Sequence, residues 1–183
     1  MIEVEIRARI NDLDGIKDKL DKLGAKFIKN EKQVDRVFGH PMFLDSRKMI
    51  IEGGFSSRLR QIDNKVSLEF KEIVRKSGGI EIKSELKDVN AGLLFLKKLG
   101  WEEAFTVSKT RDSYEYNDFE ICLDNVDKLG NFIEIERIVD SLDEKEKARK
   151  DCADLLSAIS PSSTIENRKY GDLMQEMLNK VKR

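Results

Sequence analysis

Apolar and charged residues alternate along several segments of the chain. The first is residues 2–7, IEVEIR, in which every second side chain is charged. Successive side chains of a β-strand point to opposite faces of the sheet, so Glu3, Glu5 and Arg7 share one face and three aliphatic side chains share the other. Residues 133–136, IEIE, repeat the pattern. Such alternation predicts strands with one apolar face and one charged face.

The same kind of pattern elsewhere in the chain predicts about eight strands in all, at 2–9, 33–38, 56–62, 65–73, 80–86, 105–116, 118–124 and 131–138. Asp63-Asn64 is typical of a hairpin turn, and Gly78-Gly79 precedes the fifth strand. Most of these strands follow one another without a helix between them, which favours antiparallel pairing.

Helices are predicted from apolar residues at helical spacing and from capping residues. Asn11-Asp12 begins a helix that Gly24 ends, and Asp88 begins a second helix that ends at Leu99-Gly100. Ser141 and Glu144 form a capping-box pattern ahead of a third helix, whose apolar face carries Ala148, Cys152, Leu155 and Ile159. A fourth helix, about 171–182, is expected to bury Leu173, Met174, Met177, Leu178 and Val181.

These elements predict an α+β fold: a mainly antiparallel, closed β-barrel of about eight strands with helices packed outside. The helices need an apolar surface to cover, so the apolar strand faces are expected to point outward. The charged faces would then line the interior of the barrel. We expect a single domain over residues 1–183.

Composition limits the partners of the protein. Charged residues make up 38% of the 183 residues, but the net charge is only −1. A nucleic-acid or membrane-surface binder would show a basic excess, so neither partner is expected. No apolar run is long enough to span a bilayer, and the acidic first strand does not resemble a signal peptide. Cys122 and Cys152 lack metal-type spacing and suggest free thiols, and we expect a cytoplasmic protein.

Charges of both signs on the interior face are costly unless they are hydrated or functional. Carboxylates could hold a hard divalent cation such as Mg²⁺ or Mn²⁺. Arginine and lysine could bind phosphate oxygens. A charged lumen of this kind suits a polyanion with a metal ion. Internal salt bridges, or a charged face that simply points to solvent, are the alternative interpretations.

The ordered motifs resemble those of the CYTH superfamily, the triphosphate tunnel metalloenzymes. The resemblance covers essentially the full chain and rests on ExExR at 3–7, KQVD at 32–35, SRLR at 57–60, FK at 70–71, EIKSE at 81–85, KTR at 109–111, CLDNV at 122–126, LGxFxExE at 129–136 and RKYGDL at 168–173. Family members form an antiparallel barrel that binds triphosphate with a divalent metal inside. This agrees with the fold expected from the alternation.

The resemblance implies roles for individual residues. The metal ligands would be Glu3, Glu5, Asp124, Glu134 and Glu136, of which Glu3, Glu5, Asp124 and Glu134 would serve catalysis. The substrate-binding cations would be Arg7, Arg58, Arg60, Lys71, Lys83, Lys109 and Arg111. Arg7 stands where the family has lysine, and its rigid fork can alter phosphate geometry. Because these cations repel one another, we expect removal of Arg111 to stabilise the protein without ligand.

Residues 124–134 and the segment around Tyr170 look most like the class IV adenylyl cyclases. The resemblance therefore implies conversion of ATP to cyclic AMP and pyrophosphate. The alternative is a triphosphatase that hydrolyses inorganic, nucleoside or thiamine triphosphate, since the Glu134/Glu136 pair is also found in triphosphatases. A third hypothesis is a non-catalytic binder of polyphosphate or nucleotide, and the many carboxylates argue against it. Homodimer formation is left open.

Overall fold

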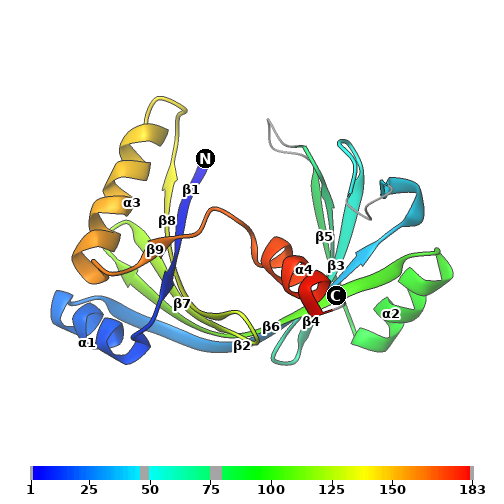
Figure 1. The fold of residues 1–183 in the computed structure, drawn as a ribbon, viewed down its shortest axis with the longest axis horizontal. Helices are drawn as coiled ribbons and strands as arrows, with labels where there is room; N and C mark the ends of the chain where they lie inside the picture. Colours follow the sequence, from blue (N-terminus) through cyan, green and yellow to red (C-terminus); the bar gives the residue numbers. More distant parts are fainter. Residues whose placement is uncertain (1, 46–49, 75–79, 182–183) are drawn as a thin grey trace. The chain divides into compact units, whose positions relative to one another are not determined.

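The structure, a computed structural model, describes residues 2–45, 50–74 and 80–181, and only the backbone of residue 181 (Figure 1). Within these ranges the chain forms strands β1 (Ile2–Ile10), β2 (Lys26–Gly39), β3 (Phe55–Ile62), β4 (Lys65–Glu72), β5 (Glu81–Leu86), β6 (Glu102–Tyr116), β7 (Phe119–Val126), β8 (Gly130–Val139) and β9 (Thr164–Ile165). The helices are α1 (Leu13–Leu23), the 3₁₀-helix η1 (Pro41–Phe43), α2 (Val89–Lys98), α3 (Lys145–Ile159) and α4 (Tyr170–Val181).

The strands form one antiparallel sheet in the order β5-β4-β3-β2-β6-β7-β8-β1-β9. The predicted α+β class and the antiparallel pairing are therefore confirmed. Strands β5 and β9 stand at the two ends of this order, and no ladder within the described ranges joins them. Hydrogen bonding thus leaves the sheet open, so the closed barrel is not confirmed. The additional strand, β9, has only two residues, too few for its alternation to be visible in the sequence.

The chain divides into two compact units. The first contains residues 1–31 and 109–173, and the second contains residues 32–108 and 174–183. Strands β2 and β6 contribute residues to both units, because the unit boundaries fall within them.

In the first unit, β1 pairs with β8 along its full length, from Ile2 opposite Val139 to Ile10 opposite Asn131. The apolar face of this pair is covered by α3, which contacts both strands, and α1 packs against α3 (Figure 1). The core contains side chains from the strands and from both helices: Ile6, Ala8, Ile121, Leu123, Ile133, Ile135, Ile16, Leu20, Cys152, Leu156 and Ile159. The prediction that helices cover the apolar face of the strands is confirmed here.

The caps explain where the helices of this unit begin and end. Asp12 accepts a hydrogen bond from the Gly15 amide at 2.8 Å, and Gly24 ends α1 with a φ of 77°, a left-handed conformation that favours glycine. Glu144 accepts from the Ser141 amide at 3.1 Å, as a capping box requires. However, α3 begins only at Lys145, so this hydrogen bond closes a turn in front of the helix.

In the second unit, the strands β2, β3, β4 and β5 pair in succession, and α2 contacts β3 and β5 (Figure 1). The core beneath the helix contains Phe38, Leu59, Val66, Leu68 and Leu96. The predicted strand 33–38 is part of a much longer strand, β2. The prediction was too short because residues 26–32, which also belong to β2, lack alternation. Gly78-Gly79, which precede the fifth predicted strand, lie outside the described residues.

Helix α4 carries the predicted apolar stripe. Leu173 and Met174 are buried, while Met177 and Leu178 are half-buried. The side chain of Val181 lies outside the described part of the chain. None of the helices described is both long and apolar enough to cross a membrane.

Both cysteines are free and buried, as expected from their spacing. Burial raises the pKa of Cys122 to about 12 and that of Cys152 to about 11. A thiol with such a pKa remains protonated at neutral pH and is a poor nucleophile, so neither cysteine is a candidate for covalent catalysis.

The close approach of α2 to the sheet predicts the effect of a mutation at Gly92. A Cβ atom there would lie 2.7 Å from a methyl carbon of Leu59 and 2.7 Å from one of Leu86. Alanine favours a helix over glycine by up to about 1 kcal/mol, but the clash with buried Leu59 costs about 1–3 kcal/mol. We expect Gly92→Ala to lower the free energy of unfolding in urea by about 1 kcal/mol.

The control for this measurement is Asn90→Ala on the exposed side of the same helix. It offers a similar gain in helix propensity without a clash, and it should leave stability unchanged or slightly higher. A Gly92→Ala variant that is as stable as the Asn90→Ala variant would show that Leu59 and Leu86 can move aside at no cost.

Candidate functional site

The strand register of the first unit gathers the predicted charged residues on one face. Directly opposite one another stand Glu5 and Glu136, Arg7 and Glu134, and Arg111 and Asp124. Cross-strand neighbours of this kind have Cβ atoms about 4.5–5.5 Å apart. The alternation in the sequence therefore correctly predicted that these six side chains share a face, which is here called the first charged face.

Asp124 is the centre of this face and has no solvent-exposed surface. Arg111 donates from Nε to Oδ1 at 2.7 Å and from Nη2 to Oδ2 at 2.6 Å. Lys109 Nζ donates to Oδ2 at 2.8 Å, and Tyr170 Oη donates to the same oxygen at 2.9 Å. Although burial alone would raise the pKa of Asp124, the hydrogen bonds and charges of Arg111 and Lys109 lower it. Asp124 is therefore an anion held by two cations.

Arg7 and Glu134 form the second part of the cluster. Arg7 donates to Glu134 at 2.5 Å, to Glu5 at 2.6 Å and to the Arg168 carbonyl at 2.8 Å, while Arg111 pairs with the other oxygen of Glu134. Burial alone would lower the pKa of Arg7, but the two carboxylates outweigh it and raise that pKa. The predicted metal ligands Asp124 and Glu134 are thus neutralised by predicted phosphate-binding cations.

Acidic side chains alone form the next row of this face. Glu5, Glu136 and Glu120 stand opposite one another on β1, β8 and β7, and Glu3 lies next to Glu5 on the same face. Burial, followed by the charges of Glu3, Glu120, Glu5 and Glu134, raises the pKa of Glu136 to about 7. Burial is also the main cause of the raised pKa of Glu5, with Glu134 contributing and Arg7 opposing.

The charge of this acidic row bears on whether its carboxylates suit a divalent metal ion. Neither Glu3 nor Glu136 forms an ion pair within the described part of the chain. No cation there offsets the repulsion between these two carboxylates. Carboxylate oxygens are the ligands that Mg²⁺ and Mn²⁺ prefer. The donor set therefore fits a hard divalent cation. No group of three or more acidic, histidine or cysteine residues in the described ranges already has an arrangement that could hold a metal ion.

The second unit carries a charged face of its own, with the other four predicted cations. Arg60 forms a fork with Asp35, with both hydrogen bonds at 2.7 Å. Arg58 donates to Glu69 at 2.8 Å and to Asp35 at 3.4 Å. Glu69 is buried, and it also accepts from Ser67 at 3.1 Å. The register of β2, β3 and β4 places these side chains on the face opposite α2.

The lysines of this second charged face are more exposed than its arginines. Lys71 Nζ lies 3.1 Å from Glu81 on β5, and Lys83 Nζ lies 3.8 Å from Glu69. The exposed fractions of the two lysine side chains are 47% and 60%, so these ion pairs are screened by water. Both lysines are therefore available to an anionic ligand at little energetic cost.

Several residues of the two faces have no metal-binding or phosphate-binding role in the prediction from the sequence. Asp35 and Glu69 are the counter-ions of the arginines in the second unit, and Glu120 extends the acidic row of the first. Tyr170 belongs to the RKYGDL motif, but no role was predicted for its side chain, which donates to Asp124. Alternation places Glu69 and Glu120 on the charged faces, and it gives Asp35 the same position on its strand. No local pattern links Tyr170 to a strand 46 residues away.

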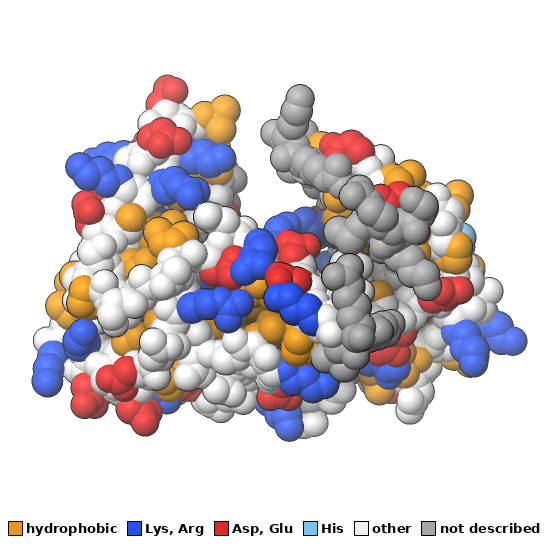
Figure 2. All heavy atoms as spheres, in the orientation of Figure 1, with side chains coloured by type: hydrophobic (Ala, Val, Ile, Leu, Met, Phe, Trp, Pro, Cys, Tyr) orange, Lys and Arg blue, Asp and Glu red, His pale blue; other side chains and the backbone are white. Residues whose placement is uncertain are grey.

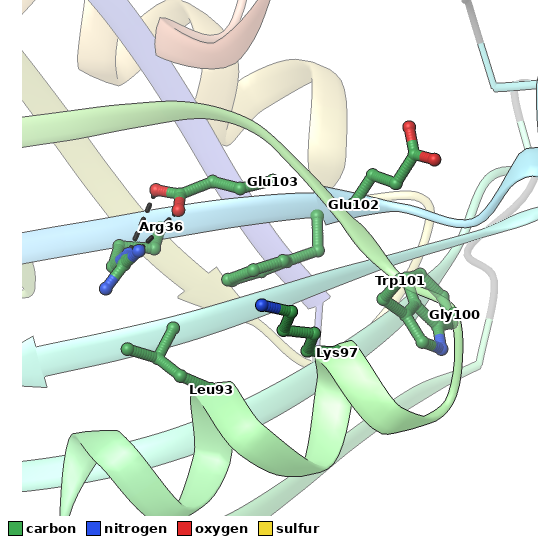
Figure 3. Close-up of a pocket in the computed structure, with 8 residues that line it drawn as sticks. Arg36, Leu93, Lys97, Gly100, Trp101, Glu102 and Glu103 are labelled. Carbon is green, nitrogen blue, oxygen red and sulfur yellow. Dashed lines mark hydrogen bonds and ion pairs between the residues drawn. The ribbon is translucent and has the colours of Figure 1, made fainter.

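A pocket of about 520 Å³ lies on the other face of the second unit. Its walls come from Arg36 and Phe38 on β2, from Leu93 and Lys97 on α2, and from the segment 100–103 (Figure 3). Arg36 donates to Glu103 at 2.9 Å across this pocket. None of the residues predicted for metal or phosphate binding lines it, so the pocket is separate from the charged face of this unit.

The described side chains that Figure 2 shows carry charges of both signs. Figure 2 shows lysine and arginine side chains interspersed with aspartate and glutamate side chains, in agreement with the net charge of −1.

Known proteins resemble this chain over most of its length. The family model of the CYTH domain matches residues 1–170. A protein of Methanocaldococcus jannaschii, provisionally named an adenylate cyclase, is 32% identical over 179 residues, which is 94% of this chain and 98% of that protein.

Solved structures share the fold over nearly the whole chain. The PH1819 protein of Pyrococcus horikoshii OT3 is 31% identical, with a TM-score of 0.76 over 96% of this chain and 99% of that one. A Hippeastrum protein provisionally named an adenylyl cyclase is 13% identical, with a TM-score of 0.66 over 96% of both chains. At that identity the likeness concerns the fold alone.

Mutual repulsion of the cations alone would make a variant without Arg111 more stable than the parent. The ion pairs of Arg111 predict the opposite change. Arg111→Ala would leave buried Asp124 and Glu134 with one cation each. Breaking a buried ion pair costs about 3–5 kcal/mol, so we expect the free energy of unfolding to fall by about 3 kcal/mol. Chemical denaturation of the ligand-free protein measures this change.

The matched control is Arg36→Ala, which removes another arginine fork from a much more exposed pair with Glu103. Its cost should stay below about 1 kcal/mol. Equal stability losses for the two variants would mean that burial does not strengthen the Arg111 ion pairs.

The raised pKa of Glu136 predicts a pH-dependent stability. An unfolded chain holds this carboxyl near its ordinary pKa of 4.5, whereas the folded protein raises it to about 7. Between these values the folded state binds more protons, so stability falls as the pH rises from 4.5 to 7. Without metal, Glu136→Gln should therefore add about 1–2 kcal/mol to the free energy of unfolding above pH 7, after discounting for solvent screening.

Below pH 4.5 the same substitution should have little effect, because the carboxyl is then protonated in both states. Glu115→Gln, at an exposed glutamate of the same face, serves as the control for the substitution of a carboxyl by an amide, and its effect is subtracted at each pH. A Glu136→Gln effect that is equal at both ends of the pH range would contradict the assigned repulsion.

Proposed function

Because the chain belongs to the CYTH family, we propose that it is a metal-dependent enzyme acting on triphosphates, and specifically that it converts ATP to cyclic AMP and pyrophosphate. The observation that carries this proposal is the first charged face, where Arg7, Lys109 and Arg111 surround Asp124 and Glu134. Three cations held by buried carboxylates suit a polyanion, since hydrogen bonds to charged groups are strong and directional.

The proposed roles follow the chemistry of the side chains. Glu3, Glu5, Asp124, Glu134 and Glu136 would hold Mg²⁺ or Mn²⁺. The bound ion would neutralise phosphate charge and lower the pKa of the attacking hydroxyl. The cations Arg7, Lys109 and Arg111 would bind phosphate oxygens and stabilise the charge that develops on pyrophosphate as it leaves. Arg58, Arg60, Lys71 and Lys83 of the second charged face would bind phosphate as well.

Before substrate binds, the cations and carboxylates of the first charged face would be paired with one another. Asp124 Oδ2 already accepts from Arg111, Lys109 and Tyr170. Phosphate oxygens are competing acceptors for the lysine and arginine donors, so substrate binding would release carboxylate oxygens toward a metal. Metal and triphosphate would accordingly bind together more tightly than either alone.

We also propose, from the resemblance to triphosphate tunnel enzymes, that residues 1–183 form one domain whose sheet closes into a barrel. The family model runs through residues of both units, which supports a single functional domain.

A triphosphatase is the second candidate, and the acidic row favours it. Glu5 and Glu136 stand opposite each other on neighbouring strands, and they could hold an ion that activates water for attack on a terminal phosphate. The Hippeastrum protein that shares the fold is described as having a dominant triphosphatase activity. Both reactions are thus chemically compatible with one charged scaffold, and they differ in which phosphorus is attacked.

Product identification distinguishes the two candidates. With ATP and Mg²⁺ or Mn²⁺, the cyclase gives cyclic AMP and pyrophosphate in equal amounts, because both products arise from one attack on the α-phosphorus. ADP with orthophosphate, or much faster cleavage of inorganic triphosphate than of ATP, would exclude the cyclase in favour of the triphosphatase. Chromatography with phosphate and pyrophosphate assays measures all of these products.

The matched control is Glu134→Gln, which keeps the shape of the side chain and removes its charge. We expect turnover to fall by about 100-fold or more at saturating Mg²⁺ if Glu134 is a metal ligand, since loss of one well-placed electrostatic contact costs about 10²–10³ in kcat. Far-UV circular dichroism should be unchanged. Undiminished turnover would remove Glu134 from the proposed site.

A further inference from the structure

Tyr170 lies on a helix, but it contacts three charged side chains next to the sheet: Asp124, Arg7 and Lys109. It is the first residue of α4, and its hydroxyl donates to Asp124 at 2.9 Å. The guanidinium carbon of Arg7 lies 4.5 Å from the centre of its ring, and Lys109 Nζ lies 5.0 Å from it. One aromatic ring therefore contacts two of the three cations proposed to bind phosphate.

The segment that leads into α4 adds a further contact to Arg7. The Arg168 carbonyl accepts from Arg7 Nη1 at 2.8 Å, so the segment and the ring hold the same guanidinium. The ring itself is fixed by Phe132, whose centroid lies 5.0 Å away in an edge-on arrangement. Tyr170 is thus held in place by the sheet and can in turn restrict the cations.

The hydroxyl is not needed to orient Asp124. The Arg111 fork already engages both carboxylate oxygens, and Lys109 adds a third hydrogen bond. The phenol also stays protonated, because burial and the nearby charges of Glu134 and Asp124 raise its pKa. The distinctive contribution of Tyr170 is therefore the face of its ring.

An aromatic ring can hold a cation without neutralising it. The ring face attracts ammonium and guanidinium groups through its quadrupole, and it carries no net charge. A carboxylate at this position would compete with phosphate for Arg7 and Lys109. Lys109 is buried, so its ammonium group has little water to solvate it, and the ring face 5.0 Å away offers a further favourable contact.

We propose that Tyr170 is a positioning residue for triphosphate binding, whose ring holds Arg7 and Lys109 in place while leaving their charge available to phosphate. This inference rests on the proposed function, because it assumes that these cations bind a triphosphate. The proposal places Tyr170, at the start of α4, in the substrate site. The group that acts there is the aromatic ring and not the hydroxyl.

The test compares the loss of the ring with the loss of the hydroxyl. Binding of inorganic triphosphate in the presence of MgCl₂ is measured by isothermal titration calorimetry. We expect Tyr170→Leu to weaken binding by about 10-fold or more, as two desolvated cation–π contacts are lost. Tyr170→Phe keeps the ring and should bind within about 3-fold of the parent, since it loses only one hydrogen bond that Asp124 can spare.

The matched control is Tyr116→Leu in the same unit. Tyr116 packs against the apolar core on the opposite face of the sheet, so this substitution removes a similar ring without touching a cation. Its triphosphate affinity should equal that of the parent. Equal weakening in both leucine variants would mean that general loss of packing, and not the contact with cations, explains the result.

A series of fluorinated phenylalanines at position 170 makes the test independent of folding. Fluorine withdraws charge from the ring face while nearly preserving its shape, so affinity should fall stepwise from phenylalanine to trifluorophenylalanine. A flat series, or a leucine variant that binds like the parent, would overturn the role of Tyr170 while leaving the proposed function intact. Failure of the parent protein to bind triphosphate would instead refute the proposed function, and this inference with it.

Discussion

The Asp124 carboxylate has no contact with solvent, and this constraint organises the first charged face. A buried carboxylate is tolerated only when it is paired and hydrogen-bonded. Lys109 and Arg111 supply the charge, and Tyr170 supplies a further donor. Because Arg111 also pairs with Glu134, and Glu134 with Arg7, the neutralisation of one residue fixes the side chains of β1, β6, β7 and β8 together.

The acidic row next to this cluster lacks such compensation, and the contrast separates two kinds of carboxylate. Cations lower the pKa of Asp124, whereas burial and neighbouring carboxylates raise that of Glu136. The first is suited to holding cations in position, and the second to receiving a positive charge. Under the proposed function, the row with excess positive charge would bind the polyanion, and the neighbouring row with excess negative charge would bind the metal ion.

The sequence was informative wherever one face of a strand is apolar, as in β1 and β8, because period-two alternation directly reports burial. It was less informative for β2, whose first residues pair with neighbours without an alternating pattern. Parity places Asp35 and Glu69 on the same face as the arginines, but alternation does not show which carboxylate pairs with which cation. The contact of Tyr170 with Asp124 depends on the path of the chain between α3 and α4, which no local rule predicts. Closure of the sheet likewise depends on contacts between distant segments.

The pairing of β1 with β8 has a consequence for how the protein is made. Arg7 and Glu134 are 127 residues apart, so β1 leaves the ribosome well before its partner β8 and waits for it while the residues between them are synthesised. Contacts of such long range also slow folding, since a large loop must close before they form. Meanwhile an unpaired strand is a template for aggregation. The charges on alternate positions of β1 keep the nascent segment hydrated during this interval, so the side chains proposed to bind metal and phosphate also protect the growing chain.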